Sequence, residues 1–220
     1  RARRVTDAQA QALLLTYDQG FAAGGAVGPA PIGPMKSQAG AFLPFPAGPR
    51  PLTTDQVSQI ASKLAVETLA KAFADGRFPG KAHEGLPRRA SELARAVQAA
   101  NAAIFTKAAA DKALTGMGTT ICAARFSPNK QRLYIGHVGD SRVYRMRGGT
   151  LKQMTVDHTM KDHGVKGAEA AHLSRAVGVW PVVPIDVLLA KPLADDSYLL
   201  CSDGLSKMVS DDAIAEILSK

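Results

Sequence analysis

LLCSDGLSKMV, residues 199–209, is the stretch that decides the fold and the chemistry of this 220-residue chain. Its apolar start predicts a strand, and Asp203 follows at the end of that strand, directly before the turn-forming Gly204. A carboxylate at the rim of a sheet is the kind of ligand that Mg²⁺ or Mn²⁺ prefers. One aspartate makes no site, so the interpretation depends on a second acid in a similar place.

A second strand-end acid lies upstream in LYIGHVGDSR, residues 133–142. Here the apolar strand runs into Gly139 and Asp140, and the glycine permits a close approach of the backbone. Two such aspartates, one on each of two strands, predict a metal site formed by Asp140 and Asp203.

Three further motifs identify a family. GMGTT (116–120), TVDHT (155–159) and LSRAVG (173–178) stand in order with the two aspartate motifs. Together the five resemble the central and late motifs of the metal-dependent serine/threonine protein phosphatases, the PPM-type or type 2C family, in its bacterial style. The resemblance covers about residues 56 to 218, since the segment 60–69 is similar to the family's first long helix.

This resemblance implies a fold, an activity and a metal site. The fold would be a layered α/β arrangement, with a central antiparallel β-sandwich flanked by helices. The activity would be hydrolysis of phosphoserine and phosphothreonine by a metal-activated water, without a covalent phosphoenzyme. The residue matching Asp203 ligates a catalytic metal in the family, and the residue matching Asp140 serves with it at a third, weaker metal position.

Other acidic motifs of the family do not occur in this chain. An Asn-Glu-Asp segment is missing near the start, and AGPRPLTTDQ (47–56) stands where Asp-Gly-Met-Gly-Gly is expected, with Asp55 as its only acid. The late Gly-Pro-Asp-Asn motif is also absent. Arg4 does not reproduce the spacing of the family's phosphate-binding arginine. With two carboxylates left, we expect a bound Mg²⁺ or Mn²⁺ to keep mostly water ligands and to bind weakly.

The chain divides into three zones. Residues 1–52 are rich in Ala, Gly and Pro and predict an irregular segment that does not match the family, except for a strand remnant at Leu13–Tyr17. Residues 53–220 form a partial phosphatase domain. Its helices are predicted from a capping box at Thr53 to Gly76, and from about Ala90 to Leu114.

The strand-rich zone follows these two helices. Strands are predicted over 119–126, 132–138, 141–147, 151–156, 182–189 and 198–201, with Gly148-Gly149 as a tight hairpin turn and a last helix capped by Ser210. Successive hairpins imply antiparallel sheets, and two preceding helices imply a layer that covers one sheet face.

Composition adds limits. At 46% hydrophobic residues the chain can bury one core as a single domain. It has no apolar run long enough for a membrane span or signal peptide, which predicts a cytoplasmic protein, and we expect a monomer. Cys122 and Cys201 lack metal-ligand spacing and predict buried thiols. His137, which alternates with apolar neighbours on its strand, is predicted to be a satisfied core or interface histidine and not a ligand. His158 and His163 lie near the region that matches the family's mobile flap, and they match no catalytic position.

Three functions follow from these observations. The first is a metal-dependent phosphatase that acts on phosphorylated Ser/Thr proteins, with a Ser/Thr kinase as an expected partner, in a chain whose first fifty residues are incomplete or altered by a frame error. The alternative is an inactive pseudophosphatase that binds a phosphoprotein or kinase. The net charge of +8 raises a third, nucleic-acid binding. We disfavour it because Arg142, Arg145 and Arg147 predict a solvated sheet face without interleaved aromatic residues.

Overall fold

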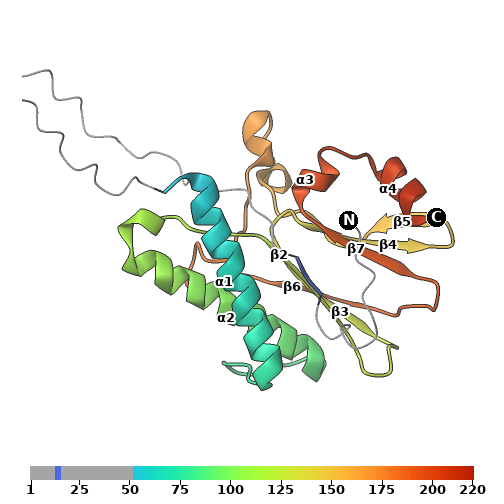
Figure 1. Ribbon diagram of the computed structural model, residues 1–220, viewed down its shortest axis with the longest axis horizontal. Helices are drawn as coiled ribbons and strands as arrows, with labels where there is room; N and C mark the ends of the chain where they lie inside the picture. The colour runs from blue at the N-terminus through green and yellow to red at the C-terminus, as the bar shows by residue number, and fades with distance from the viewer. Residues whose placement is uncertain (1–12, 16–51) are drawn as a thin grey trace, which may run out of the picture.

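Two antiparallel sheets pack face to face, and a pair of long helices covers one of them (Figure 1). The structure is a computed structural model that describes residues 13–15 and 52–220. The first sheet has the strand order β1-β2-β3-β6, and the second has the order β5-β4-β7. This is the predicted class, a layered α/β arrangement around a central antiparallel β-sandwich.

The strands are short, and most follow the predicted hairpins. The four-stranded sheet contains β1 (Leu13–Leu15), β2 (Ile121–Phe126), β3 (Leu133–Val138) and β6 (Asp186–Ala190). The three-stranded sheet contains β4 (Arg142–Arg147), β5 (Thr150–Gln153) and β7 (Ser197–Cys201). The strand predicted at 13–17 is thus present over its first three residues, and the rest of residues 1–51 lies outside the described part of the chain.

The helices begin and end where local signals place them. In α1 (Thr54–Asp75), Thr53 and Gln56 form both hydrogen bonds of the capping box, and Gly76 ends the helix with φ of 62°. The next helix, α2 (Arg88–Ala110), stops earlier than predicted because Asp111 accepts a hydrogen bond from the Ala113 amide and starts a 3₁₀ turn, η1 (Lys112–Leu114). Two short helices, α3 (Asp203–Ser206) and α4 (Asp211–Leu218), follow β7.

Alternation along the central strands separates two cores. Ile121 and Ala123 of β2 pack toward α1 and α2, whereas Cys122 and Ala124 pack between the sheets. This period of two is what a strand covered on both faces requires. Both cysteines are buried thiols, as predicted.

One strand starts later than predicted. The stretch 182–189 was expected to be extended throughout, but β6 begins only at Asp186. Pro181 and Pro184 carry no amide hydrogen and cannot donate to a neighbouring strand, so the ladder starts beyond them. Within the described residues, no helix combines the length and the apolar character needed to cross a membrane.

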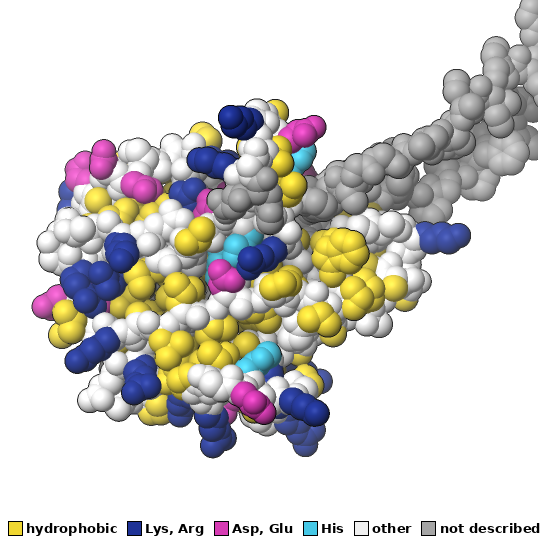
Figure 2. Space-filling model, turned by 180° about the vertical axis from the view of Figure 1, so that it is seen from behind, with side chains coloured by type: hydrophobic (Ala, Val, Ile, Leu, Met, Phe, Trp, Pro, Cys, Tyr) yellow, Lys and Arg dark blue, Asp and Glu magenta, His cyan; other side chains and the backbone are white. Residues whose placement is uncertain are grey.

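The arginines of β4, predicted to form a solvated face, are partly exposed, and two of them form ion pairs. Arg142 pairs with Asp157 at 2.7 Å and Arg147 with Asp196 at 2.6 Å, and neither guanidinium is fully exposed. The Nε atom of Arg145 is itself buried. On the face shown in Figure 2, basic side chains are spread around the outline with apolar and acidic groups between them, rather than gathered in one field.

Candidate metal centre

The five sequence motifs meet at one end of the two sheets. Four contacts join them: Thr119 with Val177, Thr120 with Ser141, Gly139 with His158, and Thr159 with Leu173. Residues separated by dozens of positions therefore form one connected structure. The fifth motif joins it through a shared pocket.

Asp140 and Asp203 line that pocket, which has a volume of about 340 Å³. Asp140 stands two residues beyond the end of β3, after Gly139, and Asp203 stands two residues beyond the end of β7 as the first residue of α3. The structure thus brings together the two aspartates that the sequence singled out. Asp157, Arg142, Lys161 and Lys207 line the same pocket, so acidic and basic groups face one another across it.

Asp203 is the more buried of the two acids, with 3% of its surface exposed. Its Oδ2 forms an ion pair with Lys207, one helical turn further along the chain. Its Oδ1 is buried without a hydrogen-bond partner among the described residues. A buried carboxylate oxygen with no donor is costly, and a cation is one partner that would satisfy it.

Asp140 carries the electrostatic signature of a neighbouring acid. Burial raises the pKa of its carboxyl group, and the charge of Asp203 raises it further, to about 6. Two carboxylates that repel each other in a pocket form a site where a divalent cation lowers the electrostatic energy. Their oxygens are hard ligands of the type that Mg²⁺ and Mn²⁺ take.

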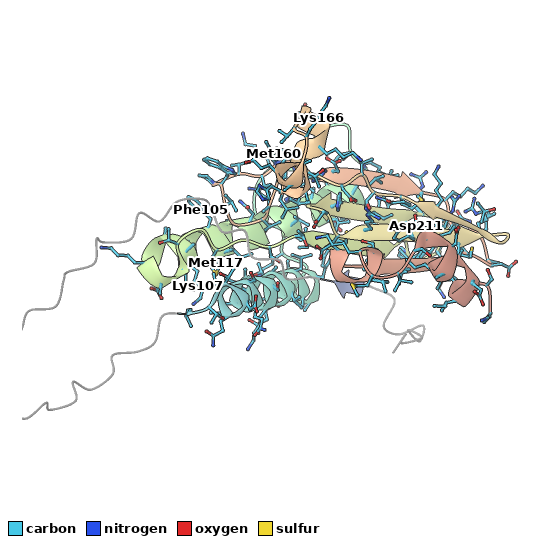
Figure 3. The ribbon with its side chains drawn as sticks, turned by 90° about the horizontal axis from the view of Figure 1, so that it is seen from above. Phe105, Lys107, Met117, Met160, Lys166 and Asp211 are labelled. Carbon is cyan, nitrogen blue, oxygen red and sulfur yellow. The ribbon has the colours of Figure 1, made fainter. Side chains whose placement is uncertain are left out.

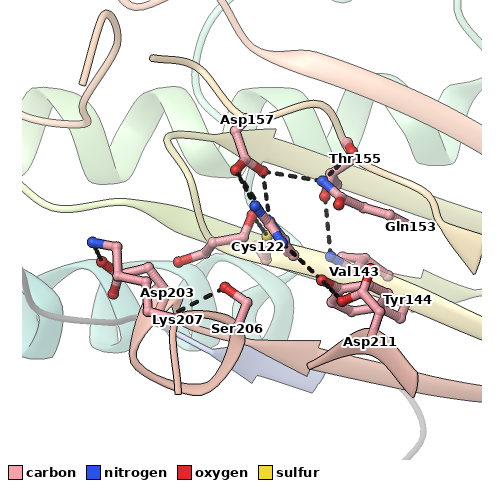
Figure 4. Close-up of polar contacts among 12 residues, drawn as sticks. Cys122, Val143, Tyr144, Gln153, Thr155, Asp157, Asp203, Ser206, Lys207 and Asp211 are labelled. Atoms are coloured by element: carbon pink, nitrogen blue, oxygen red, sulfur yellow. Dashed lines mark hydrogen bonds and ion pairs between the residues drawn. The ribbon is translucent and has the colours of Figure 1, made fainter. Parts of the chain in front are cut away.

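The third acid of the pocket, Asp157, already forms a salt bridge with an arginine. Arg142 binds Asp157 through both oxygens, with Nε to Oδ1 at 2.9 Å and Nη2 to Oδ2 at 2.7 Å, and Gln153 donates to the same carboxylate (Figure 4). The Asp157 carboxylate raises the pKa of the Arg142 guanidinium above its usual range. Asp157 belongs to the TVDHT motif, but the sequence alone assigned it no role. The salt bridge is a tertiary contact between β4 and the loop that follows β5, and no local sequence pattern predicts it.

The expected flap region stands out from the sheets. Residues 158–175 include two 3₁₀ turns, η2 (Met160–His163) and η3 (Ala168–Ala171), and Met160 and Lys166 mark the segment in Figure 3. His163 ends η2. Lys161, Gly167, Ala170 and Ala171 of this segment form one wall of the pocket. We call residues 158–175 the flap segment.

His137 differs from its prediction in one respect. It is fully buried on β3, as expected, and the Ser141 backbone interacts with its ring, but neither ring nitrogen makes a hydrogen bond of good geometry among the described residues. β3 is an inner strand covered on both faces, which leaves few polar groups within reach. Burial and then the adjacent His158 lower the pKa of His137 to about 4, so the ring is neutral at pH 7.

The remaining acid that the sequence considered lies elsewhere. Asp55 sits exposed in the first turn of α1, where its charge favours the helix N-terminus, and it does not line the pocket. Arg4 falls outside the described residues. Of the candidates named from the sequence, the structure joins Asp140 and Asp203, and it adds Asp157, Lys161 and Lys207 as neighbours.

Two facing antiparallel sheets, a helical layer and a carboxylate pair at the strand ends define the class of PPM-type phosphatase domains. A comparison with known families matches residues 52–219 to the family described as protein phosphatase 2C. The chain belongs to this family.

Curated relatives agree with this assignment. The chain is 38% identical over 171 residues to the serine/threonine protein phosphatase PstP of Mycobacterium tuberculosis, covering 73% of this chain and 31% of that protein. It is 32% identical over 174 residues to the serine/threonine phosphatase stp of Listeria welshimeri, covering 74% of this chain and 67% of the relative. The chain thus spans about a third of the first relative's length.

A solved structure supports the fold and the metal chemistry of the family. The catalytic domain of PstP, determined in complex with two manganese ions, superposes with a TM-score of 0.59 at 38% identity, covering 74% of this chain and 68% of that one. The Mn²⁺ ions are a property of that protein. They make a divalent metal the first ligand to test here.

Proposed function

We propose that this protein is a metal-dependent serine/threonine protein phosphatase whose residues 53–220 form a partial phosphatase domain, preceded by a segment that does not match the family. Asp140 and Asp203 would hold one divalent cation, Mn²⁺ or Mg²⁺. The observation that carries the proposal is the buried, unpartnered Oδ1 of Asp203 beside Asp140 in a shared pocket. With only these two acids available among the described residues, binding should be weaker than in a site with more carboxylates.

The described side chains suggest how a phosphate group would be received. When bound, a divalent cation supplies positive charge against phosphate oxygens and lowers the pKa of water. Lys161 and Lys207 add two ammonium groups to the pocket wall. Arg142 is held in place by Asp157, so its guanidinium is oriented before any substrate arrives.

The family and relatives also support a cellular setting. We propose that the substrates are proteins phosphorylated on serine or threonine, that a bacterial Ser/Thr kinase opposes this activity in a signalling pathway, and that the protein is a cytoplasmic monomer. The first of these proposals, the substrate class, is supported by the family assignment and by the names of the relatives.

A direct test is hydrolysis of an aryl phosphate and a phosphothreonine peptide by the full chain, with Mn²⁺ and with chelator, beside calorimetric titration of Mn²⁺. We expect turnover that chelator removes. Asp203→Asn should weaken Mn²⁺ binding by about tenfold or more and reduce turnover accordingly. Asp195→Asn, the same change at an exposed position outside the pocket, is the matched control and should leave both unchanged.

Two results would count against the proposal. Unchanged turnover and Mn²⁺ affinity in Asp203→Asn would remove Asp203 from the site. A folded chain that neither binds Mn²⁺ nor hydrolyses either substrate would favour the alternative, a pseudophosphatase that binds phosphoproteins without turning them over.

A further inference from the structure

His158 holds the peptide on which Asp140 is built. The His158 amide donates to the carbonyl oxygen of Gly139 at 2.8 Å, and the Gly139 amide donates to Nδ1 of the His158 ring at 3.0 Å. The ring is 5% exposed, so water does not compete strongly for these bonds. Gly139 directly precedes Asp140, and both of its backbone polar groups, the N–H and the C=O, are therefore hydrogen-bonded to His158.

The residues around Asp140 leave the loop little room to adjust by itself. Gly139 has φ of 108°, and a Cβ there would lie 2.4 Å from Cγ2 of Thr120. On the other side, the Ser141 hydroxyl lies 2.7 Å from the Thr120 hydroxyl in a buried hydrogen bond. Because both neighbours are fixed, the place of the Asp140 carboxylate depends on what holds them.

The His158 ring is itself oriented from β6. Since Nδ1 accepts the Gly139 amide hydrogen, the neutral ring carries its proton on Nε2, which lies 3.1 Å from its acceptor Oδ2 of Asp186 and also 3.3 Å from Nη1 of Arg175. The other oxygen of Asp186 accepts from Arg175 at 2.8 Å. A carboxylate on a different strand thus selects both the tautomer and the direction of the ring.

The same residues could be taken for a metal site. His137, His158 and Asp186 each offer a ligand atom, all within 4.8 Å of one another. However, the His158 nitrogen that faces Asp186 carries the proton and has no lone pair to give, and the Arg175 guanidinium already neutralises the carboxylate. The donor chemistry fits a chain of hydrogen bonds better than a cation.

We propose that His158 is a positioning residue: its ring, oriented by Asp186, fixes the Gly139 peptide and thereby holds the Asp140 carboxylate opposite Asp203. The inference rests on the proposed function, because it assumes that Asp140 binds the cation. It assigns a role to a histidine that does not line the pocket of Asp140 and Asp203.

Two amide variants separate the two ring nitrogens. In His158→Asn the side-chain oxygen lies near the place of Nδ1 and can accept the Gly139 amide hydrogen. In His158→Gln the amide lies near the place of Nε2, where it reaches Asp186 and not Gly139. We expect His158→Gln to weaken Mn²⁺ binding at least tenfold, and His158→Asn to stay within about threefold of the wild type.

A second readout needs no metal. Hydrogen exchange of the Gly139 amide in the metal-free full chain should be slow in the wild type and in His158→Asn, and faster in His158→Gln. A third readout needs no variant: two-bond ¹⁵N–¹H correlations should show the His158 proton on Nε2. Calorimetric titration of Mn²⁺ on the three proteins completes the set.

The outcomes distinguish this inference from the proposed function. Absence of Mn²⁺ binding to the folded wild type would overturn both. Mn²⁺ binding with equal affinity in all three proteins, or equal loss in the two variants, would overturn the role of His158 alone. A His158 proton on Nδ1 would also overturn it, whether or not His158→Gln folds.

Discussion

The pKa of Asp140 depends on the neighbouring Asp203 as well as on the burial of Asp140 itself. Burial and the Asp203 charge raise its pKa to about 6, within the range where small pH changes alter its charge. Lys207, which pairs with Asp203, acts in the opposite direction and lowers the Asp140 pKa. The pKa of Asp140 therefore reflects the positive and negative charges that surround it in the pocket.

This balance predicts how Mn²⁺ binding depends on pH. Asp140 must lose its proton to bind a cation, so Mn²⁺ affinity should be highest at pH 7 and above. It should fall as the pH drops through 6, approaching about tenfold per pH unit below that value. Calorimetric titrations at pH 5, 6 and 7 measure the effect. Equal affinity at pH 5 and pH 7 would contradict it.

The stability of the metal-free chain should follow the same group with a defined sign. The folded pKa lies above the ordinary value of 3.8, so the folded state binds this proton more tightly than the unfolded state. The group's contribution is therefore greatest at low pH and is lost as the pH rises through 6. Asp140→Asn removes this titrating group, so the variant should unfold at a higher urea concentration than the wild type at pH 7.

At the residue scale, sequence reasoning reached Asp140 and Asp203 and missed their partners. A strand that ends in glycine beside an aspartate is a local pattern, and both acids were found that way. Lys207 stood in the quoted stretch without a role, and the contact of His158 with Gly139 spans 19 residues. Contacts of this kind depend on how strands are placed in space, and single-sequence patterns do not contain that information.

At the scale of elements, a side chain of α2 anchors a turn that lies far from it in the sequence. Asn101 is fully buried in the middle of α2. Its Oδ1 accepts from the Gly178 amide at 2.7 Å, and its Nδ2 donates to the carbonyl oxygens of Trp180 and Pro181. One side chain therefore fixes the turn that leads from the flap segment into β6.

Replacing this side chain should destabilise the protein clearly. Asn101→Ala leaves the Gly178 amide buried without a partner and creates a small cavity, so we expect a loss of about 2–3 kcal/mol in the free energy of unfolding. Urea denaturation followed by circular dichroism measures it. Gln98→Ala on the same helix removes one weak bond to Pro181 at 3.4 Å and should cost less than about 0.5 kcal/mol. Equal effects of the two changes would refute the anchoring role.

At the scale of elements, the sequence succeeded where the signal is local. The capping box and Gly76 delimit α1, and Gly148-Gly149 connects β4 and β5 as expected. The pairings of β3 with β6 and of β4 with β7 join strands that are far apart in the chain, and no local turn motif predicts them. The fold class followed from the order of helices and hairpins, while the sheet order did not.

At the scale of the whole molecule, the four-stranded sheet depends on its edge strand β1 to pair with one side of β2. β1 pairs with β2 from Leu13 opposite Ala124 to Leu15 opposite Cys122. A chain that begins at Leu52 lacks β1 and leaves the backbone groups of β2 without a strand on that side, although the family match starts there. Unpaired edges favour association with another chain.

We therefore expect the chain from Leu52 onward to associate as its concentration rises, whereas the full chain stays monomeric under the same conditions. Size-exclusion chromatography with light scattering over a range of protein concentrations measures the mass directly. A shortened chain that remains monomeric throughout would show that β1 is not needed to cover this edge.

The pairing of β1 also sets an order of events during synthesis. About a hundred residues separate β1 from its partner β2, so at about 5–20 residues per second the ribosome completes β2 roughly 5–20 seconds after β1 has been made. During that interval Leu13–Leu15 is an apolar segment without a sheet to join. Among the described strands, β1 is thus made well before its partner β2, and slower translation of the helices between them would lengthen the time that β1 remains unpaired.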